Sequence, residues 1–185
     1  DVHQSERGGQ RDFQVALQRA IHKMDHPEYQ EYDAAEFPVI DKDGFRLKLL
    51  MGSHESVDAP IQEEITHAQY YDVEVSAGQR FNQRLPLNHN GFLYVFEGSG
   101  KLKDRPLARH MLVTFEGASN RIDLVAGDQG ARFIVVSGKP INESVVQYGP
   151  FVMNTREEID QAMRDFQSNN FVRHKAWMRR EKVSA

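Results

Sequence analysis

The chain is dominated by short segments in which apolar and polar residues alternate, the pattern of strands with one buried face. Glycines punctuate these segments at short intervals, which is typical of a β-sandwich or β-barrel. The sequence therefore predicts an all-β domain. Its expected strands are FRLKLLM (45–51), QYYDVEV (69–75), RFNQRLP (80–86), FLYVFEG (92–98), HMLVTF (110–115), RIDLVA (121–126) and RFIVVSG (132–138).

The period changes near the C-terminus, in NTREEIDQAMRDFQSNNF (154–171). Thr155 followed three residues later by Glu158 has the spacing of a capping box, in which each side chain accepts a hydrogen bond from a free amide of the first helical turn. Apolar residues then recur at helical spacing, at Ile159, Ala162, Met163 and Phe166. We expect a C-terminal α-helix that packs on the barrel.

The amino-acid composition limits the metal ligands and the partners that the protein can have. The 185 residues include no cysteine, so disulfides and thiolate ligands are excluded and any metal must use His, Asp, Glu or water. A net charge of −4 argues against nucleic-acid binding. No apolar run approaches the ~20 residues that span a bilayer. We expect a cytoplasmic protein, or a nuclear one in a eukaryote, with neither a membrane nor nucleic acid as partner.

The stretch PLNHNGFLYVFEGSG (86–100) raises the question of a metal site. Metal-binding barrels of the cupin superfamily carry H-x-H and then E just before such a strand, and this spacing falls on Leu85, Leu87 and Gly91, none of which can coordinate a cation. The later segment 117–136, where a further histidine ligand is expected, has no histidine. His89 lies off this register, and we interpret it as a turn or surface residue. The sequence predicts a barrel without a complete metal site.

The segment SGKPINESVVQYGPFVMNTREEIDQA (137–162) closely resembles the end of the C-terminal domain of the pirin family. The resemblance extends back through GFLYVFEGSG (91–100) to KMDHPEYQ (23–30), which is similar to the inter-domain connection of pirins. It implies a cupin (double-stranded β-helix, or jelly-roll) barrel, the second of two. The implied domains are the end of an N-terminal cupin strand with the connection (1–40), the C-terminal cupin barrel (41–150), and a C-terminal helix with a basic tail (151–185).

The resemblance also implies ligands. Pirins hold Fe(II) in their N-terminal cupin with an H-x-H pair and with the His and Glu of an HSE segment. DVHQSE (1–6) occupies the corresponding place with one residue more, so His3 and Glu6 are the candidate second ligand pair, a partial site. The chain contains no H-x-H. We therefore expect no catalytic residue in this chain and no tight binding of iron by the chain alone.

Three functions remain open. The resemblance implies an iron-dependent quercetinase (flavonol 2,3-dioxygenase), with this domain supporting an N-terminal cupin partner. It equally permits a non-enzymatic regulator that binds a protein, either a transcription factor complex or a metabolic enzyme, and the basic tail with Arg173, Lys175, Trp177, Arg179 and Arg180 is a candidate contact. The third function is binding of an apolar small molecule such as a flavonol inside the barrel, lined by Leu85, Leu87, Phe92, Tyr94 and Phe96.

Overall fold

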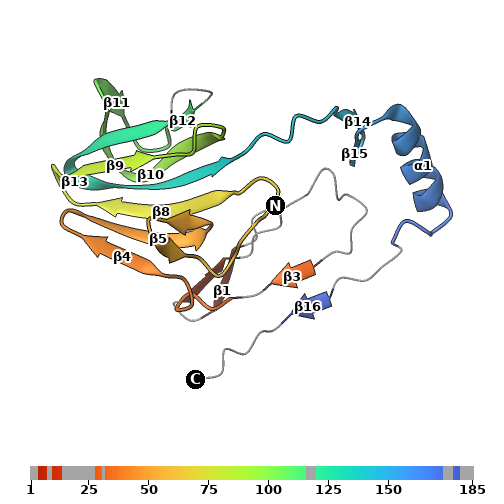
Figure 1. Cartoon of the computed structure of the whole chain (residues 1–185), viewed down its shortest axis with the longest axis horizontal. Helices are drawn as coiled ribbons and strands as arrows, with labels where there is room; N and C mark the ends of the chain where they lie inside the picture. The colour runs from red at the N-terminus through yellow and green to blue at the C-terminus, as the bar shows by residue number, and fades with distance from the viewer. Residues whose placement is uncertain are drawn as a thin grey trace. The chain divides into compact units, whose positions relative to one another are not determined.

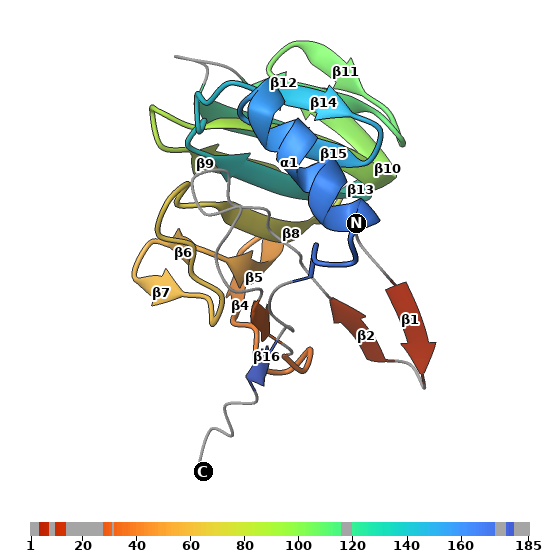
Figure 2. The ribbon, with the colours of Figure 1, turned by 90° about the vertical axis from the view of Figure 1, so that its right-hand side faces the viewer.

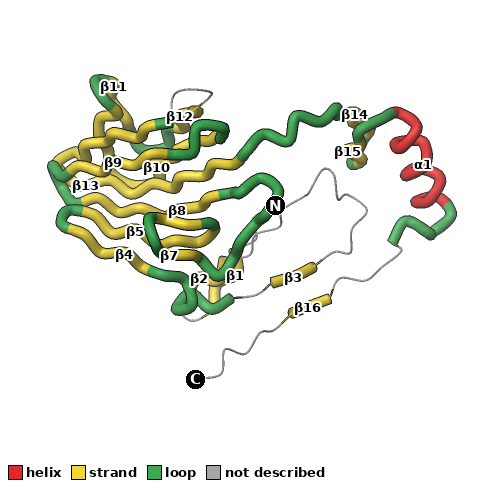
Figure 3. Tube along the Cα trace, viewed as in Figure 1, coloured by secondary structure: helices red, strands yellow, loops and turns green. Residues whose placement is uncertain are grey.

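The computed structural model describes residues 4–7, 10–13, 28–30, 32–115, 120–172 and 177–179. The chain divides into two compact units, one of residues Ala35–Pro140 and one of Asp1–Ala34 with Ile141–Ala185. Within the described residues, the first unit consists of strands joined by loops, and the second has strands and a helix (Figure 3). No helix within the described residues is long and apolar enough to cross a membrane.

The unit of residues 35–140 is an antiparallel sheet of eight strands (Figure 1). Its strand order is β11-β10-β13-β8-β5-β4, with β12 also paired to β10 and β9 to β13. The strands are β4 (Val39–Lys42), β5 (Phe45–Met51), β8 (Gln69–Val75), β9 (Arg80–Arg84), β10 (Asn90–Leu102), β11 (Arg105–Leu107), β12 (Leu112–Phe115) and β13 (Arg121–Gly138). The hairpin of β6 (Ser53–His54) and β7 (Val57–Asp58) forms a separate small sheet.

Two strands expected from the sequence are one strand in the structure. The segments 121–126 and 132–138 are both part of β13, which runs for 18 residues. Its first part pairs with β9 and its last part with β8. β10 pairs with both parts, and the register of this pairing shifts twice, between Val95 and Glu97 and between Gly98 and Gly100. Gly98 and Gly130 have positive φ angles of 70° and 76° there, which glycine adopts at little cost. These irregularities let one long strand serve two parts of the sheet.

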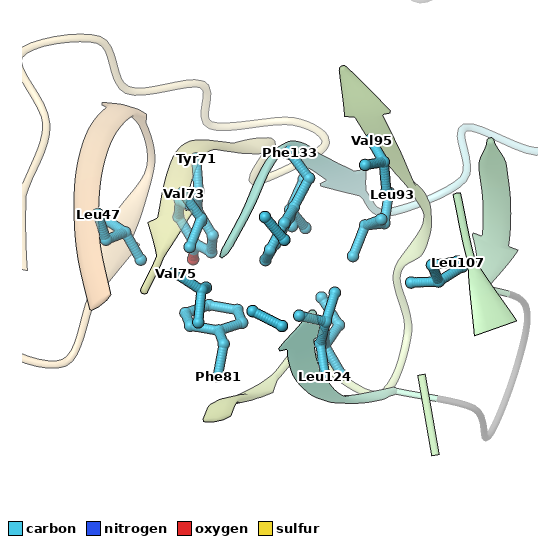
Figure 4. Packing of buried hydrophobic residues seen from close by; sticks show 14 of the residues in the cluster. Leu47, Tyr71, Val73, Val75, Phe81, Leu93, Val95, Leu107, Leu124 and Phe133 are labelled. Carbon is cyan, nitrogen blue, oxygen red and sulfur yellow. The ribbon is translucent and has the colours of Figure 1, made fainter. Parts of the chain in front are cut away.

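The core follows from the alternation of side chains along the strands. Tyr71, Val73 and Val75 on β8 are almost fully buried, as are Leu47 and Leu49 on the neighbouring β5. These residues meet Phe81, Leu93, Val95, Leu124 and Phe133 from the other strands (Figure 4). The Phe81 ring packs edge-on against Phe133, at 5.6 Å between centroids. Burial of each such large side chain stabilises the fold by about 1.5–3 kcal/mol.

The predicted C-terminal helix is present as α1 (Arg156–Gln167), and both halves of its capping box form. The amide of Glu158 donates to Thr155 Oγ1 at 3.2 Å, and the amide of Thr155 donates to Glu158 Oε2 at 3.2 Å. Ile159 and Ala162 are buried, as expected, whereas Phe166 is 64% exposed. Figure 2 shows α1 beside the hairpin of β14 (Val146–Tyr148) and β15 (Phe151–Met153), with which it is in contact.

The remaining strands belong to the same unit as α1. β1 (Gln4–Arg7) pairs with β2 (Gln10–Phe13), and β3 (Glu28–Gln30) pairs in parallel with β16 (Trp177–Arg179). Part of the basic C-terminal segment is therefore backbone-paired to a strand near the N-terminus, a long-range contact that the sequence pattern did not indicate.

Candidate functional site

The inner and outer faces of β10 decide what lines the barrel. Leu93 and Val95 are 0% and 1% exposed and belong to the core cluster (Figure 4). Alternate residues of a strand point to opposite faces, so Phe92, Tyr94 and Phe96, which are only half-buried, lie on the outer face. The predicted lining by these three aromatic residues is therefore wrong. Because residues on both faces of this strand are apolar, the sequence pattern did not show which residues point to the inner face.

The two leucines that we placed in the same lining lie in different environments. Leu85 is 3% exposed and is part of the core cluster, whereas Leu87 is 70% exposed. Leu87 stands in the turn that precedes β10, so strand alternation does not hold it to the same face as Leu85. The space enclosed by the sheet is filled by side chains of its own residues, as is common in small barrels.

At Gly91, the position expected for a glutamate ligand, the fold leaves no room for any side chain. A Cβ atom at this position would lie 2.5 Å from the carbonyl oxygen of Val136 and 2.8 Å from the Cβ of Ser137, both on β13. Real Cβ atoms do not approach a backbone so closely, so a glutamate here would force β10 and β13 apart. The ligand positions of this barrel therefore do not fit a metal ion.

Within the described residues, no group of three or more His, Asp or Glu side chains gathers at a spacing that could hold a metal ion. Leu85, Leu87 and Gly91 supply no donor atom themselves, so no step of chemistry at a metal can be assigned to these positions.

His89 is the residue whose environment the sequence analysis got wrong. It follows a turn, and its amide donates to the Pro86 carbonyl at 3.1 Å, yet its side chain is only 6% exposed. Its Nδ1 lies 3.2 Å from the buried hydroxyl of Ser137, which in turn lies 3.5 Å from Gln69 Oε1. His89 is thus a buried link between the start of β10, the end of β13 and the start of β8.

Burial lowers the pKa of the His89 imidazole, and the nearby His67 lowers it further. The neutral ring is therefore the form that the fold accommodates. The sequence did contain a signal for this placement, because His89, Gly91, Leu93 and Val95 share one parity. Counting back from Val95 along the strand assigns His89 to the inner face.

The candidate iron ligands are placed only in part. Glu6 lies in β1, opposite Arg11 in β2, while His3 lies outside the residues that the structure describes. The pairing of His3 and Glu6 as ligands remains a prediction. In the basic tail, Trp177 and Arg179 lie in β16, and Arg173, Lys175 and Arg180 fall outside the described residues.

The outer face of the sheet carries a charged pair among aromatic rings. Arg132 on β13 donates to Asp72 on β8 through two nitrogens, at 3.2 and 2.7 Å, and its guanidinium lies 5.1 Å from the centre of the Phe96 ring. The hydrogen bonds to Asp72 raise the pKa of Arg132. Burial raises the pKa of the Tyr70 phenol on the same face. This face is therefore ordered by a partly buried ion pair.

Comparison with known proteins agrees with the geometry. The described fold matches the crystal structure of a quercetin 2,3-dioxygenase from Acinetobacter baumannii with a TM-score of 0.69 and 28% identity, over 78% of this chain and 50% of that chain. Within the described residues, an antiparallel eight-stranded sheet of this kind with one C-terminal helix is the architecture of a cupin domain. The predicted fold class is confirmed.

The family follows from the sequence matches. Residues 70–172 match the family described as the pirin C-terminal cupin domain. A pirin-like protein of Arabidopsis thaliana is 38% identical over 165 residues, which cover 84% of this chain and 53% of that protein. Human pirin is 32% identical, over 86% of this chain and 57% of that protein. The chain belongs to the pirin family, and it spans about half the length of these relatives.

Proposed function

We propose that this chain is the second cupin of a two-cupin cytoplasmic protein and supports an Fe(II)-dependent, quercetinase-type flavonol dioxygenase centre in the first cupin. The observation that carries the proposal is the crowding at Gly91, which removes room for a ligand in a family whose relatives have about twice the length of this chain. The name of the Acinetobacter baumannii relative, of which this chain covers half, supports a flavonol as the substrate.

His3 and Glu6 have a defined part in this proposal. They would complete the iron site of the first cupin, together with an H-x-H pair that this chain does not contain. Imidazole and carboxylate ligands suit non-haem Fe(II), which binds and activates O₂ when positions remain open. The contribution of the present chain is then to supply one ligand pair and to hold the first cupin in place.

The unit that contains α1, which we call the helical unit, has an exposed aromatic cluster. This cluster supports the proposal that the chain holds the first cupin in place. Phe151, Phe166 and Phe171 contact one another edge-on, with centroid distances of 5.4 to 6.2 Å. Phe166 and Phe171 are nevertheless 64% and 43% exposed, and Val172, the residue after Phe171, is 74% exposed. Apolar surface of this kind commonly marks an interaction site. We assign the Phe151–Phe166–Phe171 cluster to the contact with the first cupin.

A chimera tests the proposal. The first half of the Acinetobacter baumannii quercetin 2,3-dioxygenase would be joined to this chain in place of the half that matches it. Elemental analysis for iron and O₂ uptake with quercetin would then be compared between the chimera and this chain alone. We expect stoichiometric iron and O₂ uptake for the chimera, and substoichiometric iron without uptake for the chain alone.

Variants of the chimera separate the parts of the proposal. Glu6→Ala should lower the iron content, whereas Glu143→Ala, in the helical unit, should leave it unchanged. Phe166→Ser should weaken the association of the two halves when they are expressed as separate chains. Stoichiometric iron in the chain alone would contradict the empty second cupin. A folded, iron-loaded chimera without O₂ uptake would favour the protein-binding regulator over the dioxygenase.

A further inference from the structure

His54, at the end of β6, is a buried imidazole without a hydrogen-bond partner among the residues that the structure describes. The residue is 4% exposed, and both Nδ1 and Nε2 are buried and unpaired. Most buried side-chain polar atoms in proteins have a partner, so a ring with neither nitrogen satisfied requires an explanation. The proposed function does not use this residue.

The surroundings of His54 favour its neutral form. Its ring meets the Tyr71 ring edge-on, at 5.8 Å between centroids, and Tyr71 is itself fully buried. Burial raises the pKa of the Tyr71 phenol, so this neighbour stays neutral and offers no negative charge. Two charged groups also act on the ring, Glu55 and Lys42, and they are joined to each other at 2.6 Å.

These charges do not offset the burial of the imidazole. Burial lowers the pKa of His54, Glu55 raises it, and Lys42 lowers it again. The carboxylate of Asp58, on β7, accepts a hydrogen bond from Ser53 at 2.6 Å. A protonated His54 would therefore carry its charge in a buried site, and the Glu55 carboxylate that acts on it is already paired with Lys42.

The hairpin that carries His54 is held by turn and side-chain contacts rather than by strand pairing with the main sheet. β6 and β7 form a two-stranded sheet with two residue pairs, and no other described strand pairs with either. The Tyr71 hydroxyl donates to the Ser53 carbonyl at 2.9 Å, and the amide of Ala59 donates to the Gly52 carbonyl at 2.9 Å. Small elements with few backbone bonds open locally far more often than the whole protein unfolds.

The hairpin covers part of the core. Val57 packs against the core cluster, and Ala59, directly after the hairpin, belongs to that cluster. Figure 2 shows β6 and β7 at the side of the sheet near β5. If the hairpin moved away, Tyr71 and the adjacent interior would become accessible to solvent or to an apolar molecule.

We propose that the β6–β7 hairpin, residues 53–58, is an acid-released flap over the barrel interior and that His54 is its latch. In the closed flap the imidazole is neutral and packs on Tyr71. In the open flap it is hydrated and can bind a proton without cost. Acid therefore favours the open flap.

The direction of the pH effect follows from linkage. The open flap has an ordinary histidine pKa of about 6.5 and the closed flap a lower one. Opening is thus independent of pH above that value and becomes more frequent as the pH falls below it. The increase is at most about tenfold per pH unit, until the pKa of the closed flap is reached.

Hydrogen exchange read by mass spectrometry tests the flap. Exchange of peptides covering residues 52–62 and of peptides from β13 would be measured at pH 7.5, 6.5 and 5.5 and corrected for the intrinsic rates. We expect protection of 52–62 to fall by up to about tenfold between pH 6.5 and 5.5, while β13 stays far better protected than 52–62 at every pH. His54→Phe, which keeps an aromatic ring that cannot titrate, should abolish this response.

The matched control is His110→Asn, because His110 is exposed and has a positive φ angle of 68°, which asparagine tolerates. It should keep the full pH response. A response that persists in His54→Phe, or protection of 52–62 that stays constant with pH, would overturn the proposal. Constant protection is also the result expected if a protonated His54 simply drew Glu55 away from Lys42.

An NMR titration of the unmodified chain gives a second measurement in case His54→Phe does not fold. The closed-state His54 resonances should titrate below pH 6.5, and signals of the open flap should grow over the same range. An ordinary pKa for His54 with an unchanged flap would rule out the latch.

Discussion

At the scale of single residues, the Asp72–Arg132 pair offers a test of the ordered outer face. Asp72 is 11% exposed and accepts two hydrogen bonds from Arg132, which is 34% exposed and lies over Phe96. Asp72→Asn should lower the free energy of unfolding by about 1–2 kcal/mol, because it leaves a half-buried guanidinium without its charged partner. Urea unfolding at pH 7 measures the change.

The exposed pair Arg80–Asp123 is the matched control. Arg80 is 64% exposed, and solvent screens its 2.6 Å contact with Asp123. Asp123→Asn should therefore cost no more than about 0.5–1 kcal/mol. Equal losses in the two variants would mean that burial of the Asp72 pair has no energetic consequence.

At the scale of elements, the pairing of β10 with β13 depends on Gly91. Gly91→Ala should destabilise the domain by about 1–3 kcal/mol, because its Cβ would press on the Val136 carbonyl of the neighbouring strand. Gly138→Ala, on β13 opposite Asn90, is the control, since its nearest atoms would be 3.7 Å away. Urea unfolding of both variants should separate them, and a larger loss for Gly138→Ala would contradict the crowding.

At the scale of the whole molecule, stability should depend on pH through two buried histidines. Burial lowers the folded-state pKa of both His54 and His89, so the unfolded chain binds protons first as the pH falls. The free energy of unfolding should be constant above about pH 6.5 and should decline below it by at most about 1.4 kcal/mol per pH unit and group. Thermal and urea unfolding between pH 7.5 and 5.5 measure this slope.

The double variant His54→Phe/His89→Gln should flatten that decline, and His110→Asn should not. The Glu55 carboxylate, whose pKa is lowered by Lys42, changes its charge only below its usual value of 4.5 and so lies outside this window. A stability that rises toward pH 5.5 in the unmodified chain would contradict the assignment of both histidines as neutral in the fold.

Local sequence information was sufficient for features that depend on neighbouring residues. The bounds of β5 and β8 were predicted as the structure has them, because each is a short, mostly apolar segment that alternates over most of its length and is bounded by glycine or polar turns. The capping box at Thr155 and Glu158 was readable because all its atoms lie within one helical turn. The absence of ligand donors at Leu85, Leu87 and Gly91 required only residue identities and their spacing.

Tertiary structure alone decided what depends on strands far apart in the sequence. The burial of His89, the crowding at Gly91 and the outward direction of Tyr94 all follow from the register of β10 against β13, more than 30 residues later. The union of two expected strands in β13 and the pairing of Trp177 with Glu28 are likewise long-range. Register is fixed by packing of the whole sheet, since a slip of one residue reverses every side chain. A local pattern therefore determined that these strands form, and only the folded sheet determined which residues they bury.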